Sequence, residues 1–168
     1  MWLYERRSLL TLLAGLPVLA AGCGFSPALA PGGAAHALRG RIRMRTPRDS
    51  AEFALVAALE ERLGRPQDAR YLLDYDITTG SDTSAVTRRL GATRQVLTGR
   101  LDYSVTDTTT DGEMTQGTVR SFTGWSLTTD PLSERVARAD AEKRLMRILA
   151  DQIAAQILAS ADDWAIPA

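Results

Sequence analysis

The only cysteine in the 168-residue chain, Cys23, lies where its thiol could carry lipid. A lone cysteine has no internal disulfide partner, so any chemistry it performs belongs to its own thiol. It follows the run Leu19-Ala20-Ala21-Gly22, which is preceded by a basic start, Glu5-Arg6-Arg7, and an apolar stretch from Ser8 to Ala21. This is the order of parts in a bacterial export signal. We therefore predict a lipobox, in which residues 1–22 are cleaved between Gly22 and Cys23. Cys23 then carries a diacylglycerol and an N-acyl chain.

Other interpretations of the amino-terminal segment stay open. It could be an ordinary cleaved signal followed by an incidental cysteine. It could be a retained membrane anchor, although its apolar run is shorter than the ~20 residues that span a bilayer. The pair Arg6-Arg7 is also found in twin-arginine export signals. The small residues before Cys23 and the short apolar run favour the lipoprotein.

Arginines form the second group of residues with a chemical use. Four of them alternate with Gly40, Ile42 and Met44, and this period of two is typical of one face of a strand. The four are Arg39, Arg41, Arg43 and Arg45. Like charges crowded along one strand cost stability unless something anionic compensates them. The pattern therefore indicates a ladder of arginines on the outer side of a half-buried strand.

Five further arginines follow this ladder and are candidates for an anion-binding site that would take a phosphorylated lipid or an acidic partner. They are Arg88, Arg89, Arg94, Arg100 and Arg120. The first three are expected in a connection over residues 78–95, and the last two could join them across the sheet. The alternative is that the arginines form salt bridges with acidic residues on an open sheet face. Those acidic residues are Asp74, Asp76 and Asp102.

Catalytic chemistry is not favoured by the remaining residues. His36 is the only histidine and lies in a segment rich in Pro, Gly and Ala, where no scaffold would hold it against a nucleophile. No His/Cys cluster has metal-ligand spacing, and no Gly-rich phosphate loop is present. The 20 basic residues balance 20 acidic ones, so no nucleic-acid partner is expected. We predict a non-enzymatic protein with no metal and no cofactor apart from the acyl chains on Cys23.

The elements that must position these residues form one domain over residues 38–168, preceded by a flexible tether over residues 23–37. Alternation predicts a first strand over Arg39–Arg45, and capping signals predict a helix from Asp49 to Gly64. Three further strands are expected over 71–78, Val96–Thr109 and Gly117–Thr128. The mixed parity of the last strand predicts a bulge.

Turn residues at Thr110–Glu113 predict a hairpin between the last two strands, and a long helix from Pro131 to Ala161 is expected to end the chain. The simplest way to bury both apolar helix stripes is to lay the helices against the sheet. We therefore predict an α+β fold, a two-layer sandwich in which two helices pack on one face of a four-stranded mixed sheet.

Two segments resemble a known family. The run Cys23-Gly24-Phe25-Ser26-Pro27 is similar to the opening of the mature LPS-assembly lipoproteins (LptE), although Ala28 stands where an aromatic residue is familiar. The runs Ala139–Leu145 and Leu149–Ile153 are similar to the final helix of that family. Size and element order also agree with that family over essentially the whole mature chain, and the lipobox adds to the resemblance.

The resemblance implies a lipoprotein on the periplasmic face of the cell outer membrane. Its partners would be the LptD-type β-barrel, which it plugs and helps to assemble, lipopolysaccharide (LPS) and the membrane lipid that holds Cys23. Gly24, directly after the anchor, is compatible with sorting to the outer membrane. LPS binding by basic residues in this family makes the five arginines from Arg88 to Arg120 candidates on chemical grounds.

Two competing functions remain. An auxiliary lipoprotein of an ABC-type intermembrane lipid transport complex would share the lipobox, the size and the α/β build. A periplasmic hydrolase is the third possibility.

Overall fold

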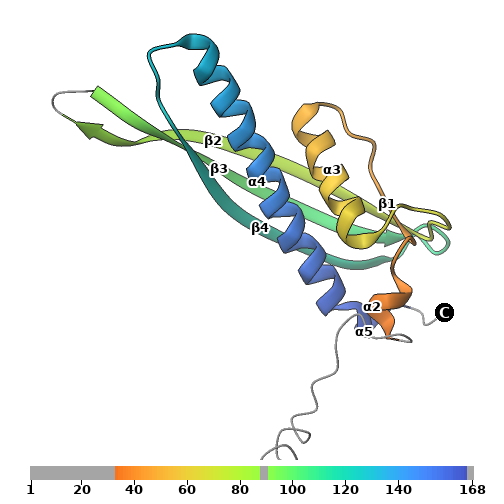
Figure 1. Cartoon of the computed structure of the whole chain (residues 1–168). Helices are drawn as coiled ribbons and strands as arrows, with labels where there is room; N and C mark the ends of the chain where they lie inside the picture. The colour runs from red at the N-terminus through yellow and green to blue at the C-terminus, as the bar shows by residue number, and fades with distance from the viewer. Residues whose placement is uncertain (1–32, 88–90, 166–168) are drawn as a thin grey trace, which may run out of the picture.

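The structure is a computed structural model that describes residues 33–87 and 91–165. Its helices are α2 (Ala34–Ala37), α3 (Ser50–Leu63), α4 (Pro131–Ala159) and α5 (Ala161–Trp164). Its strands are β1 (Ile42–Met44), β2 (Tyr71–Thr87), β3 (Gly91–Asp107) and β4 (Glu113–Ser126). The strands form one sheet in the order β1-β2-β3-β4, with β1 parallel to β2 and the other neighbours antiparallel. Helices α3 and α4 lie side by side on one face of this sheet (Figure 1). The predicted α+β fold with a four-stranded mixed sheet is confirmed.

The core lies between the sheet and the two long helices. Odd-numbered residues of β2 and β3, such as Leu73 and Leu101, point toward the helices and are fully buried. Leu59 of α3 and Leu149 and Ile153 of α4 meet them and are equally buried. Even-numbered residues of β2, β3 and β4 point away from the helices, because side chains alternate along a strand. The sheet therefore has one covered face and one face without a helix, which we call the open face.

A glycine lets α4 approach the sheet closely. A side chain at Gly99 of β3 would lie 2.9 Å from a methyl carbon of Leu145, which is closer than real Cβ atoms come to other atoms. The two long helices are also joined at their surface, where Arg62 Nε donates to Asp151 Oδ1 at 2.7 Å.

Three of the four predicted helix ends are confirmed, and the end of the last helix is not. Asp49 caps α3 by accepting a hydrogen bond from the backbone N–H of Glu52 at 2.8 Å, and Gly64 ends that helix with a positive φ of 85°. Asp130 accepts from the N–H of Ser133 at 2.9 Å before Pro131 begins α4. The carboxy-terminal helix was predicted to reach Ala161, whereas α4 ends at Ala159 and a separate short turn, α5, follows.

The β2–β3 hairpin is longer than predicted. The sequence placed a connection over residues 78–95, but β2 continues to Thr87 and β3 begins at Gly91. Polar residues such as Thr78 and Ser81 pair with β3 through their backbones. The pairing of β2 with β3 therefore continues through residues that show no apolar pattern. Arg94 consequently lies within β3 and not in a loop.

Three other expectations need correction. The first strand was predicted over Arg39–Arg45, but it is restricted to Ile42–Met44, because residues 39–41 form a turn. The last four residues of the predicted tether form the helix α2, which is held by the burial of Ala35. The bulge predicted within Gly117–Thr128 is absent from the described strand, whose register runs unbroken from Gly117 to Ser126. The apolar residue that breaks the parity, Phe122, instead points to the open face.

Helices α2 and α5 lie together at one end of the molecule, which we call the α2–α5 end (Figure 1). Strand β2 begins there, since the rings of Tyr71 and Trp164 meet edge to face with centroids 5.2 Å apart. Among the described helices, none is both long and apolar enough to cross a bilayer.

Candidate anion-binding site on the open sheet face

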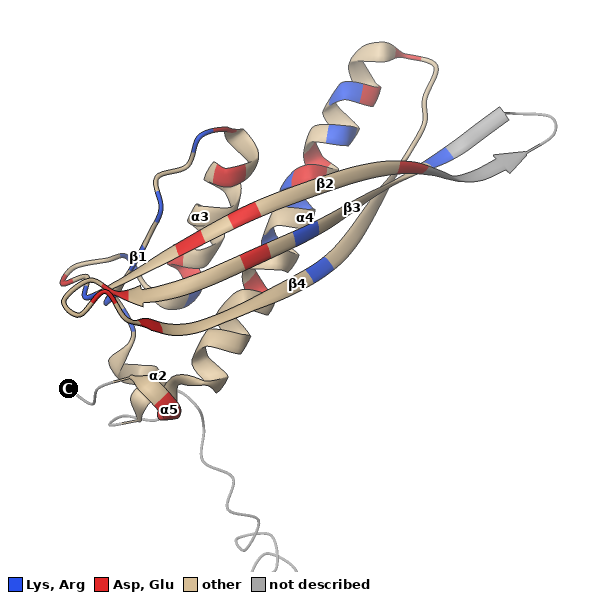
Figure 2. Ribbon diagram, turned by 180° about the vertical axis from the view of Figure 1, so that it is seen from behind, with Lys and Arg blue, Asp and Glu red and all other residues tan. Residues whose placement is uncertain are grey.

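The open face carries charged side chains that separate along the strands. Figure 2 shows this face from the side opposite the helices, with charged residues of both signs along the strands. The register sorts the charges into two halves. Acidic residues predominate in the half toward the α2–α5 end, and arginines predominate in the half toward the far end of the hairpin, where Asp82 of β2 is the acidic residue described on this face. We call these the acidic half and the basic half.

The centre of the basic half is a cross-strand pair of arginines. Arg100 of β3 lies directly opposite Arg120 of β4, so the structure brings these two predicted residues together. Directly opposed side chains in an antiparallel sheet have Cβ atoms about 5 Å apart, so two like charges there repel unless an anion compensates them. Arg120 makes no hydrogen bond or ion pair within residues 33–87 and 91–165.

Arg100, in contrast, already has a counter-charge. Its Nε donates to Asp102 Oδ2 at 2.9 Å and its Nη2 donates to Asp102 Oδ1 at 2.6 Å. Thr118 of β4 also donates its hydroxyl to Asp102. The hydrogen bonds from Arg100, with that from Thr118, lower the pKa of Asp102 to about 2. For Arg100 the salt-bridge alternative is therefore realised. Arg120 has no hydrogen-bonded or ion-paired partner among the described residues, and its charge reaches Asp102 only at longer range, where it adds to the lowering of that pKa.

An apolar hollow adjoins these arginines. The next cross-strand row toward the far end consists of Gly80, Thr98 and Phe122. Gly80 has no side chain to fill the row, and the Phe122 ring is 70% exposed beside it. The hollow has a volume of about 500 Å³ and is also lined by Arg100 and Arg120. An exposed aromatic ring beside an unpaired guanidinium suits a ligand that is both apolar and anionic.

The other predicted arginines are further away or cannot be placed. Arg94 lies on β3 six residues before Arg100, about 20 Å away at the usual rise of a strand. Its guanidinium lies over Gly124 of β4. A Cβ added at Gly124 would be 3.3 Å from Arg94 Nε. Arg94 also lacks a hydrogen bond or ion pair among the described residues. Arg88 and Arg89 lie outside the residues that the structure describes.

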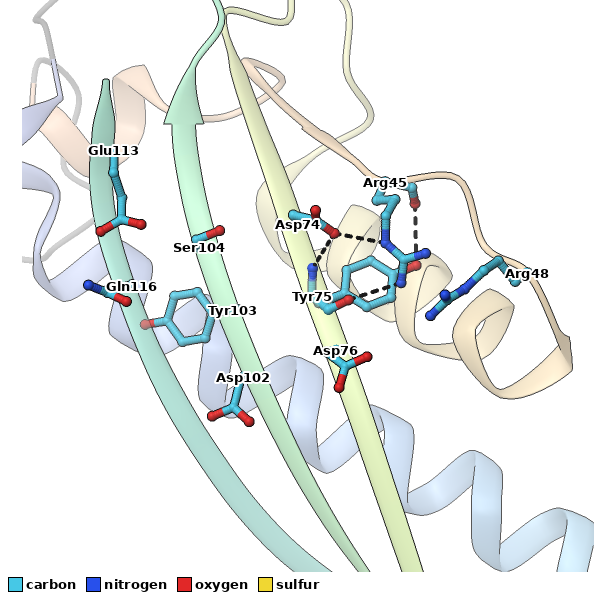
Figure 3. Close-up of a pocket in the computed structure, with 10 residues that line it drawn as sticks. All are labelled: Arg45, Arg48, Asp74, Tyr75, Asp76, Asp102, Tyr103, Ser104, Glu113 and Gln116. Atoms are coloured by element: carbon cyan, nitrogen blue, oxygen red, sulfur yellow. Dashed lines mark hydrogen bonds and ion pairs between the residues drawn. The ribbon is translucent and has the colours of Figure 1, made fainter. Parts of the chain in front are cut away.

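The acidic half forms a second, more polar hollow of about 540 Å³ (Figure 3). Asp76 of β2 lies directly opposite Asp102 of β3, and Asp74 lies opposite Ser104. Asp74 forms an ion pair with Arg45, whose Nε lies 2.8 Å from Asp74 Oδ1. Repulsion between these carboxylates and an anionic ligand would direct such a ligand to the basic half.

Arg45 does not extend the outward arginine ladder. It turns over the ring of Tyr75, 4.4 Å from the ring centroid, and its Nη2 contacts Glu52 Oε1 at 3.3 Å. Glu52, which is 5% exposed, also accepts hydrogen bonds from the backbone and guanidinium of Arg48. The guanidinium of Arg48 is the main reason that the pKa of Glu52 falls to about 2. This cluster joins the start of α3 to β2 and has a structural role.

Histidine and possible metal ligands are the remaining candidate groups. His36 lies exposed on α2, away from both halves of the open face. Among the described residues, no three His, Cys, Asp or Glu side chains are grouped as a metal ion would require.

Phe122 and Gly80 are the members of the basic half that sequence reasoning missed. Phe122 has the opposite parity to the apolar residues Val119 and Trp125 of the same strand, and this mixed parity led to the predicted bulge. The signal that could have separated them is its spacing of two from Arg120, since residues i and i+2 of a strand share a face.

Comparisons with known proteins identify the fold. A scan of protein-family models finds no match, and a search of curated proteins finds none either. Solved structures do match. A protein from Caulobacter crescentus CB15, provisionally assigned as a lipoprotein, is 18% identical with a TM-score of 0.63, over 76% of this chain and 95% of its own.

Two further solved structures are similar. Rare lipoprotein B from Shewanella oneidensis has a TM-score of 0.54 at 12% identity, over 73% of this chain and 94% of its own. A minor lipoprotein from Acinetobacter baumannii has a TM-score of 0.53 at 15% identity, over 71% of this chain and 89% of its own. The chain has the fold of these bacterial lipoproteins. At such low identities the likeness concerns the fold alone.

Proposed function

We propose that this protein is an outer-membrane lipoprotein, anchored through Cys23, that plugs and helps to assemble the LptD-type LPS translocon barrel and assists LPS delivery. The observation that carries the proposal is the basic half of the open face, where an unpaired Arg120 adjoins the exposed ring of Phe122. The role is one of binding and assembly, without catalysis. The lipobox and a fold shared with bacterial lipoproteins support the anchoring.

LPS is a phosphorylated glycolipid, and its chemistry matches both parts of the basic half. A guanidinium can hold a phosphate through two parallel hydrogen bonds. Arg120 is available for such a contact, and Arg94 lies on the same face further along β3. Apolar parts of the ligand would contact the ring of Phe122, which is exposed on a charged surface and would lose water contact on binding.

The proposed plug requires a polar surface that faces a wet barrel lumen. The open face meets this requirement with its rows of Asp, Arg and Thr side chains, and no described helix covers it. A monomeric domain would tolerate such a face equally well, so partner capture is the necessary test.

The test is affinity capture of the full-length, acylated protein from solubilised membranes of the cells that produce it. We expect a large outer-membrane β-barrel to co-purify with it, together with LPS. Capture of an inner-membrane ATPase complex would instead support the auxiliary lipoprotein of a lipid transporter. Acylation is read in the same sample from the mass of the amino-terminal peptide. An unmodified Cys23 would refute the anchoring.

A further inference from the structure

The turn before β1 and the turn after α3 are joined into one rigid surface at the α2–α5 end. Gly40 donates its backbone N–H to the carbonyl of Leu63 at 2.9 Å, and Gln67 donates to the carbonyl of Gly40 at 2.9 Å. Gly40 and Gly64 have positive φ angles of 73° and 85°, which favour glycine. A Cβ at Gly64 would lie 3.0 Å from the backbone nitrogen of Gly40. The two turns are therefore packed backbone against backbone.

Three arginines surround this junction, and two of them have no ion-pair partner among the described residues. Arg39, Arg41 and Arg65 line a hollow of about 380 Å³ between the two turns. Arg39 and Arg41 make no side-chain hydrogen bond or ion pair with any described residue. Arg65 is 88% exposed, and its Nε is 3.8 Å from the nearest carboxylate oxygen, that of Glu60. Asp68 is the one acidic residue that lines the hollow. The site thus has an excess of positive charge held on a rigid backbone.

This junction lies close to where the chain enters the domain. Gly33 is the first described residue, and α2 follows it directly and leads into Arg39. Only nine residues lie between Cys23 and Gly33, so the ten Cα–Cα steps that join them span at most about 35 Å even when fully extended. If Cys23 carries lipid, the three arginines stay within reach of the membrane that holds it.

We propose that Arg39, Arg41 and Arg65 form a binding site for the phosphate headgroups of anionic phospholipids in the membrane that holds Cys23. This inference rests on the proposed lipid anchoring, and it is separate from the basic half of the open face. The site fixes how the domain is oriented on the membrane. It also accounts for Arg39 and Arg41, which were predicted on the first strand but lie in the turn before it and take no part in the open face.

The test uses the acylated, full-length mature protein in two kinds of vesicle, one of phosphatidylcholine alone and one that also contains phosphatidylglycerol. Phenylglyoxal modifies accessible guanidiniums, and mass spectrometry gives the rate at each arginine. We expect phosphatidylglycerol to slow modification of Arg39, Arg41 and Arg65 by about fivefold each, and high salt to restore it. Arg135 and Arg147 are exposed arginines of α4 and serve as internal controls whose rates stay unchanged.

A matched pair of variants separates a specific site from general attraction. Arg39→Gln/Arg65→Gln should remove the protection of Arg41, whereas Arg135→Gln/Arg147→Gln removes the same charge and should retain it. Equal rates in both vesicles, for a protein that floats with both, would overturn the headgroup site and leave the anchoring intact. Failure to float with phosphatidylcholine vesicles would refute the anchoring and this inference together.

Discussion

Removing the carboxylate of Asp102 should strengthen LPS binding. Asp102 holds two guanidinium nitrogens of Arg100, at 2.6 and 2.9 Å, which would otherwise face a ligand beside Arg120. Asp102→Asn removes the charge, leaves one acceptor oxygen and keeps the size of the side chain. Charge-assisted hydrogen bonds are about twice as strong as neutral ones. The guanidinium N–H groups of Arg100 that Asp102 no longer holds should therefore bind an LPS phosphate and raise the affinity for LPS about threefold to tenfold. If the basic half only stabilises the fold, no such gain arises.

The pKa of Asp102 makes substitution the appropriate perturbation. Its pKa lies at about 2, so lowering the pH within the range where the protein is handled leaves the carboxylate ionised. Asp76→Asn is the matched control, since it removes the same charge directly across the β2–β3 ladder without freeing a guanidinium. Titration of fluorescent LPS at constant ionic strength compares both variants with the wild type. The reasoning would be refuted if Asp102→Asn bound LPS no more tightly than Asp76→Asn while both variants kept the circular dichroism of the wild type.

Two further predictions concern stability. The pKa of Glu52 is about 2 in the folded protein and ordinarily 4.5, so its ionised form stabilises the fold above pH 4.5 and that contribution is lost as the pH falls toward 2. The full difference corresponds to about 3 kcal/mol. Because its partner Arg48 is 64% exposed, screening by solvent reduces this contribution. We expect Glu52→Gln to cost roughly 1–2 kcal/mol at pH 7 and somewhat less than half of that at pH 3. Urea unfolding at the two pH values measures the difference, and an equal cost at both would contradict it. Leu149→Ala should cost about 2–5 kcal/mol, because the side chain is fully buried between α4 and the sheet. A change in urea midpoint near zero would show that α4 does not pack as described.

The element order and the helix ends were predictable because they depend on local signals. Asp49, Gly64 and Asp130 act through residues within one turn of the chain, so the sequence alone identifies them. The turn at Asp111 and Gly112 was predictable for the same reason, and Asp111 has the positive φ of 54° that such turns need.

Features that depend on strand register were not predictable. The extension of β2 beyond Thr78 depends on backbone pairing with β3, and its polar residues carry no alternating apolar pattern. The outward position of Phe122 is fixed by its pairing with Thr98, and its spacing of two from Arg120 is the one sign of that position in the sequence. Arg45 left the predicted ladder because Glu52, seven residues away on α3, offers it a buried carboxylate. Such contacts arise only when the helix packs against the sheet.

The most direct test of the central claim is LPS binding by the charge-reversal variant Arg120→Glu. Arg120 is exposed and has no described hydrogen-bond or ion-pair partner, so its reversal should leave the fold intact. Arg147→Glu on α4 is the matched control for net charge. We predict that Arg120→Glu weakens binding of phosphorylated LPS at least about tenfold, and dephosphorylated LPS much less, whereas the control binds like the wild type. Equal affinities of both variants for phosphorylated LPS would contradict the assignment of the basic half as its binding site.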